Sequence, residues 1–135
     1  MTSATRTAAL SATIVGILLA ASVCERAHAQ QHGRWTAVEI AALPAFCQAR
    51  LARNEAQLSH WNRTFGRTTV LHLHHYCYGL LHMQRANKTT NSAQRRRHFN
   101  SAVKQFDYVL RHWGPDSPLY QEVQANKSVA QAFSQ

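Results

Sequence analysis

Apolar residues recur every three or four positions from residue 37 to the end of the chain, which is the period of an amphipathic helix. This spacing predicts four helices, over about 37–57, 69–86, 95–113 and 118–133. No sustained alternation of β-branched and polar residues predicts a strand. The pattern therefore indicates an all-α fold of about four helices.

Two signals mark where the first predicted helix begins and bends. Thr36 and Glu39 have the spacing of a capping box, in which each side chain binds the other residue's backbone N–H. Pro44 lies inside the helical pattern, where it removes a hydrogen-bond donor and clashes with the preceding turn. We therefore expect the helix to begin at Thr36 and to kink or restart at Pro44.

The remaining helices are separated by polar stretches. Residues 59–68 are expected to form a connector with a turn at Gly66, and the polar residues 87–94 are expected to form a surface loop. Residues 114–118, GPDSP, should end the third helix sharply, with Ser117 as the cap of the fourth.

The first part of the chain has the pattern of a secretory signal. A basic Arg6 precedes the uncharged apolar residues 8–23, and an A-x-A motif ends at Ala29. We expect residues 1–29 to be cleaved near Ala29, which leaves residues 30–135 as one helical domain in the periplasm or outside the cell. The apolar run is shorter than the roughly 20 residues of a stable membrane span, so we expect no transmembrane span in the mature chain. An uncleaved anchor is the alternative.

Cysteine usage agrees with export. Cleavage after residue 29 would remove Cys24 and leave Cys47 and Cys77. An even number of cysteines in an exported chain predicts a disulfide between them. A bridge that closes a loop of about thirty residues would contribute about 3–4 kcal/mol to the free energy of unfolding.

The whole chain carries a formal net charge of +9 at pH 7. In an exported protein, such a charge favours an acidic protein partner or an anionic envelope surface over nucleic acid. Its triple arginine, residues 95–97, stands at the start of a predicted helix, where phosphate or carboxylate groups would be its natural targets.

A large–small pair in the second predicted helix is followed by an Ala–aromatic–Val pattern in the third, and then by a proline in the turn. The residues with this pattern are Tyr78, Gly79, Ala102, Phe106, Val109 and Pro115. The chain resembles the tetratricopeptide-repeat superfamily, and the segments ALPAFCQARL, LHHYCYGLLHMQRA and FDYVLRHW look like small exported bacterial proteins of that fold. The resemblance implies antiparallel helical hairpins with a core over about 69–125, and it implies no particular activity.

The second predicted helix is unusually rich in histidine. An alternative interpretation of this segment is a periplasmic copper or zinc site formed by His72, His74, His75 and Cys77. His82 is about 10 Å further along the helix than His75, too far to share one ion. No second motif supplies the remaining ligands at a recognisable spacing, so we favour a packing and docking role for the helix.

The sequence thus predicts a non-enzymatic protein-interaction or assembly module of the bacterial periplasm or envelope, with no cofactor. The expected partner is a protein or an extended, partly acidic peptide. The candidate docking residues are His75, Tyr76, Tyr78, His82, Arg95, Arg96 and Arg97. The alternatives are the metal-binding protein described above and a subunit of a larger envelope complex.

Overall fold

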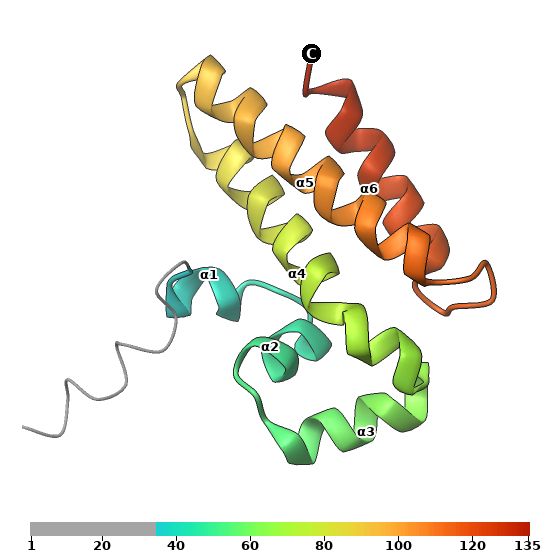
Figure 1. Cartoon of the computed structure of the whole chain (residues 1–135). Coiled ribbons are helices and arrows are strands. Elements are labelled where there is room, and N and C mark those ends of the chain that lie inside the picture. Colours follow the sequence, from blue (N-terminus) through green and yellow to red (C-terminus); the bar gives the residue numbers. More distant parts are fainter. Residues whose placement is uncertain (1–34) are drawn as a thin grey trace, which may run out of the picture. The chain divides into compact units, whose positions relative to one another are not determined.

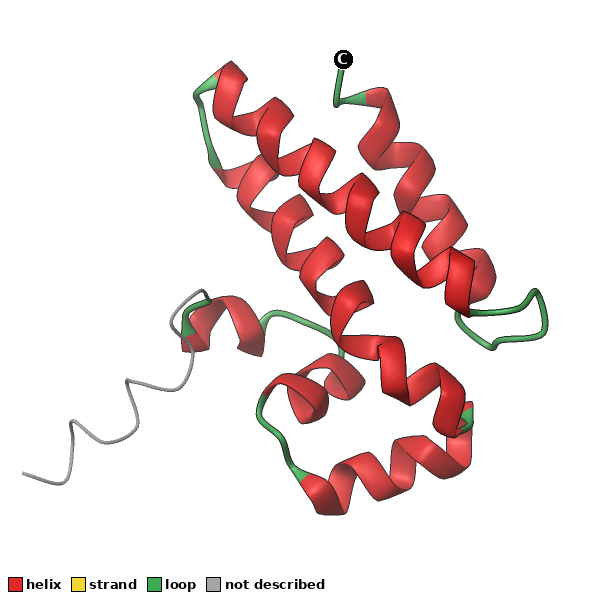
Figure 2. Cartoon of the chain, in the orientation of Figure 1, coloured by secondary structure: helices red, strands yellow, loops and turns green. Residues whose placement is uncertain are grey.

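The computed structural model describes residues 35–135, and these are helical apart from short turns (Figures 1 and 2). The helices are α1 (Ala37–Ala41), α2 (Ala45–Leu51), α3 (Glu55–Phe65), α4 (Arg67–Lys88), α5 (Ser92–His112) and α6 (Tyr120–Ala132). This part of the chain contains no strand, which confirms the all-α prediction. None of its helices is both long and apolar enough to cross a membrane. The expected signal segment, 1–29, lies outside the described residues.

The expected number of four helices is wrong for this region, which has six. The predicted capping box at Thr36 is present, and the first predicted helix is divided at Pro44 into α1 and α2, as the proline indicated. The expected connector 59–68 is instead mostly the helix α3. The side chain of Asn54 caps its first turn, and its apolar residues pack against α2 and α4, which outweighs a helix-poor sequence. Gly66 ends α3 with a φ of 83°.

The expected loop 87–94 is also wrong, because only residues 89–91 separate α4 from α5. Asn91 causes this early start: its side chain accepts a hydrogen bond from the backbone N–H of Gln94 at 2.9 Å. Ser117 does not cap α6. Its hydroxyl oxygen lies 3.2 Å from that of Thr69, and α6 begins after Leu119 without a side-chain cap.

The helices α4 and α5 form an antiparallel hairpin, and α6 lies along α5 (Figure 1). The two helices pack closely at Gly79, where a Cβ atom would lie 2.7 Å from Cδ1 and 2.8 Å from Cζ of Phe106. The ring of Phe106 is fully buried. Gly79 is therefore the packing notch that the sequence indicated.

A disulfide joins Cys47 of α2 to Cys77 of α4, as predicted, with the two Cα atoms 5.5 Å apart. Both cysteines are fully buried. A second apolar cluster, formed by Ala49, Leu58 and Val70, packs α2 and α3 against the first turns of α4. The bridge and this cluster thus tie the short helices α2 and α3 to the α4–α5 hairpin.

Candidate docking site

A continuous chain of aromatic and imidazole rings follows the seam between α4 and α5. Neighbouring ring centroids lie between 3.7 and 6.0 Å apart. We call this surface the ring strip; in order along the seam it comprises His112, His72, Tyr108, His75, His74, Tyr78, Trp35, His82 and His98. Most of its side chains are partly exposed, whereas Trp35 and His82 are buried. Such rings offer large, rigid contact areas with polar tips.

The strip exists because α4 and α5 run antiparallel. Residues early in α4 therefore face residues late in α5, and residues late in α4 face residues early in α5. His72 accordingly stacks on His112, with centroids 4.4 Å apart, while His82 meets His98, with centroids 5.6 Å apart. On α4, His72, His75, Tyr78 and His82 recur three or four positions apart and so share one face of the helix, while His74 lies at the edge of that face beside His75.

Tyr108 is the centre of the first half of the strip, which runs from His112 to His74. Its ring packs on that of His75 at a centroid distance of 3.7 Å, and its hydroxyl oxygen lies 3.4 Å from Nδ1 of His72. His75 donates from Nδ1 to the amide oxygen of Gln105 at 2.7 Å. These contacts hold the rings in place while leaving them partly exposed to solvent.

Two imidazoles in this half of the strip, those of His72 and His74, have a lowered pKa. Burial, together with nearby His75 and Arg50, lowers the pKa of His74 to about 4. Burial and the neighbouring imidazoles of His112 and His75 also lower the pKa of His72. Arg50 is held beside His74, with Nη2 3.5 Å from Nδ1 of His74 and 3.2 Å from the backbone oxygen of Leu71, to which it donates.

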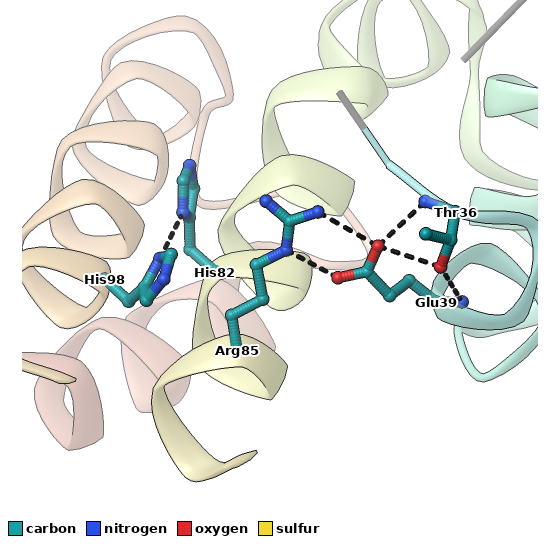
Figure 3. A network of polar contacts seen from close by, with 5 residues as sticks. All are labelled: Thr36, Glu39, His82, Arg85 and His98. Atoms are coloured by element: carbon teal, nitrogen blue, oxygen red, sulfur yellow. Dashed lines mark hydrogen bonds and ion pairs between the residues drawn. The ribbon is translucent and has the colours of Figure 1, made fainter. Parts of the chain in front are cut away.

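At the other end of the strip, the Nδ1 atoms of His82 and His98 lie 3.3 Å apart, and the two imidazoles face each other (Figure 3). The pKa of His98 is lowered by burial and by the cations Arg85 and Arg97, while Glu39 acts weakly in the opposite direction. Protonation is therefore opposed at this end of the strip as well.

An ion pair fastens α1 beside this end of the strip. Arg85 donates from Nη2 to Oε2 of Glu39 at 3.0 Å (Figure 3). Its guanidinium group also lies 4.2 Å from the ring centroid of Trp35. The same carboxylate accepts a hydrogen bond from the backbone N–H of Thr36 at 2.8 Å. Hydrogen bonding from Arg85 is the main reason that the pKa of Glu39 falls to about 2.

The structure separates the residues that the sequence proposed for docking. His75 and Tyr78 are partly exposed on the ring strip, whereas His82 is 5% exposed. Tyr76 is wrong as a docking residue because it is fully buried on another side of α4. Its hydroxyl group donates to Glu122, and burial is the main cause that raises its pKa. The arginines at 95–97 are exposed in the first turns of α5, just before His98.

The alternative copper or zinc set is not assembled. The sulfur of Cys77 is in the disulfide and so offers no thiolate. The Nδ1 atoms of these three histidines contact different partners: that of His72 contacts Tyr108, that of His74 contacts Arg50 and that of His75 contacts Gln105. Within residues 35–135, no three His, Cys, Asp or Glu side chains are grouped so that they could hold a metal ion.

Sequence reasoning missed several members of the strip and its surroundings. These are Trp35, Arg50, His98, Tyr108 and His112. The spacing of Tyr108 and His112 would place them on one face of a helix, but only the register of the hairpin brings that face to α4. The sequence predicted a loop over 87–94, whereas the turn covers only residues 89–91. The register of the hairpin could therefore not be predicted.

A hollow lies on the far side of α4 from the ring strip. It has a volume of about 300 Å³. Leu43, Leu80, Met83, Gln84 and Glu122 are among its lining residues. The α4 residues in this lining are about half a helical turn away from Tyr78 and His82, so the two surfaces are distinct.

No family model matches the chain, and no curated protein or solved structure matches it. The geometry of the ring strip is therefore the basis for assigning a function.

Proposed function

We propose that this protein is a non-enzymatic interaction or assembly module whose docking surface is the ring strip. The strip itself is the observation that carries the proposal. Aromatic side chains and arginines are enriched in protein interfaces because they combine a large contact area with polar groups. Here the partly exposed rings adjoin the exposed arginines 95–97 on the same helical hairpin. The expected occupant is a segment of another protein, including a neighbouring subunit in an envelope complex.

A tetratricopeptide-like arrangement is part of the proposal. It is supported by the close approach of Gly79 to Phe106 in the α4–α5 hairpin and by α6, which lies along α5 as the first helix of a following repeat would. Helical repeats of this kind present extended surfaces that bind other protein segments. Such a surface requires no catalytic group.

The proposed location is the bacterial periplasm or envelope. The signal-like pattern of residues 1–29 supports it, with cleavage near Ala29. The disulfide between Cys47 and Cys77 supports it independently, because disulfides persist in oxidising compartments and are rare in the cytosol.

Site-specific photo-crosslinking in intact cells of the source bacterium would test this function. A photoreactive phenylalanine analogue would replace Tyr78 or His112 on the ring strip. As matched controls it would replace Met83 in the hollow or Val129, which is 47% exposed on α6. We expect the same discrete adduct from both strip positions and from neither control. Adducts from the controls alone, or none from the strip in variants that keep the wild-type melting curve, would contradict the proposal.

A further inference from the structure

The histidines of the ring strip lie in surroundings that are poor in negative charge. Within the described part of the chain, none of the five histidines His72, His74, His75, His98 and His112 forms an ion pair with a carboxylate. The carboxylate of Glu39, which acts weakly on His98, is itself bound by Arg85. These five imidazoles thus share one surface on which the described residues offer little negative charge.

The groups that face these imidazoles come from every helix around them. From α5, His112 and Tyr108 face His72, and Gln105 faces His75. From α2, Arg50 faces His74. On the remaining side of the strip, Arg85 and Arg97 act on His98.

In the described residues, His72 and His74 therefore face neutral rings, other histidines or Arg50, and His98 faces two arginines and, more weakly, Glu39. Protonating one of them places a positive charge beside groups that repel it or that leave it incompletely solvated. The free protein consequently resists protonation along the strip, as the lowered pKa values of His72, His74 and His98 indicate.

A bound carboxylate would reverse this balance. A negative charge within a few ångströms of an imidazole favours the imidazolium form, so carboxylates laid along the strip would raise the affinity of these histidines for protons. Coupling between two ligands is reciprocal, so protons must raise the affinity for the carboxylates by the same factor. The exposed arginines 95–97 add an attraction that does not depend on pH in this range.

We propose that the partner of the ring strip is a carboxylate-rich segment and that docking takes up protons from solvent onto the strip histidines. This inference depends on the proposed docking function and adds the chemistry of the partner and its regulation. It follows that the complex tightens as the medium becomes acidic. The protein would then hold its partner more firmly in a mildly acidic envelope than at neutral pH.

Binding of a defined probe tests the inference. The probe is a short synthetic peptide that alternates glutamate with tyrosine, and the control replaces every glutamate by glutamine. Affinity of the full mature chain is measured at about pH 7.5, 6.5 and 5.5 and at constant salt, where the glutamates stay largely ionised. Uptake of one proton per complex changes the dissociation constant about tenfold per pH unit. We expect tightening of at least about tenfold across the range for the glutamate peptide and no change for the glutamine peptide.

Matched variants assign the effect to the strip. We expect H72Q/H98Q to make the dissociation constant depend less steeply on pH than in the wild type, and the slope is compared separately from any change in affinity at about pH 7.5. R95Q/R96Q should weaken binding by a similar factor at every pH, and it keeps Arg97, which acts on His98. His60 is exposed on α3 outside the strip, so H60Q should behave as the wild type. Calorimetry in buffers of different ionisation enthalpy counts the protons directly.

The possible failures are distinguishable. Glutamate-peptide binding that is independent of pH, or that weakens toward low pH, overturns the proton coupling. Specific crosslinks from Tyr78 together with no binding of the glutamate peptide at any pH overturn the acidic partner, while the docking function stands. Absence of crosslinks from the strip overturns the docking function itself.

Discussion

Gly79 lies in the packed interface between α4 and α5, and its missing side chain lets the ring of Phe106 rest against the α4 backbone. Phe106 is fully buried and packs close to the ring of Tyr76, at a centroid distance of 5.8 Å. Interiors are packed so densely that a ring in this position has little room to move. One residue without a Cβ therefore sets the distance between the two helices that carry the ring strip.

Replacing Gly79 by alanine should lower the free energy of unfolding. The new methyl group would overlap Phe106, and overpacking of this kind costs about 1–3 kcal/mol. Urea denaturation followed by circular dichroism measures the change. The control is G114A, because nothing lies within 4 Å of the added methyl group there. If both variants unfold at the same urea concentration, close packing at Gly79 is not what holds the hairpin together.

At the scale of elements, the short helices depend on contacts beyond themselves. α2 has seven residues and no side-chain cap at its amino end, and isolated helices of that length are unstable in water. The disulfide fixes α2 to α4, and the ion pair between Glu39 and Arg85 fixes α1 to α4. Since Trp35 precedes α1 and forms part of the ring strip, these attachments also hold one end of the strip.

Removing the bridge with C47A/C77A should lower the free energy of unfolding by about 3–4 kcal/mol, because the unfolded chain regains the entropy of a loop of 30 residues. Hydrogen exchange should show where the protein loosens first. We expect the largest increase in exchange rate in α1–α3 and a smaller increase in α5 and α6, because the bridge directly fixes α2 to α4. Wild-type protein that has been reduced serves as the comparison. Equal loosening of all six helices would show that the bridge stabilises the molecule as a whole and not α2 in particular.

At the scale of the whole molecule, the protein combines a net charge of +9 with a surface of histidines that favour the neutral form. The unfolded pKa of a histidine is about 6.5, and that of His74 in the folded protein is about 4. Between these values the unfolded chain binds a proton that the folded chain does not. Stability from His74 is therefore fully present above about pH 6.5 and is lost as pH falls through about 4.

The melting temperature should consequently fall steadily from about pH 6.5 to about pH 4, and H74Q should make this decline less steep. Scanning calorimetry across the range measures it. H60Q changes a histidine outside the strip and should keep the wild-type slope. Glu39 contributes little to this slope, because its pKa of about 2 in the folded protein places most of its protonation below the measured pH range. An H74Q profile parallel to that of the wild type would contradict this account.

The periodic pattern of the sequence predicted the long helices well, since a helix with one apolar stripe repeats regularly. It also located the capping box at Thr36, the break at Pro44 and the notch at Gly79, because each is a local chemical signal. The prediction failed between helices. α3 gains its stability by packing on other helices, and Asn91 starts α5 earlier than its polar surroundings indicated.

The candidate site could be predicted only in part from the sequence, for the same reason. Histidine density pointed to α4, but it did not show which residues stay exposed. Tyr76 and Tyr78 are two positions apart, yet the first is fully buried and the second is partly exposed on the ring strip. Their difference depends on where α5 and α6 pack, which is not a property of α4 alone.

The sequence by itself therefore determined the helical class and the packing notch at Gly79, because periodicity and side-chain size act locally. It also predicted the pairing of Cys47 with Cys77, on the expectation that cleavage removes Cys24. Only the tertiary structure decided that His72 meets His112 and that His82 meets His98. These contacts depend on the register of two antiparallel helices. That register is set by a turn of three residues and by the packing of one phenylalanine on one glycine.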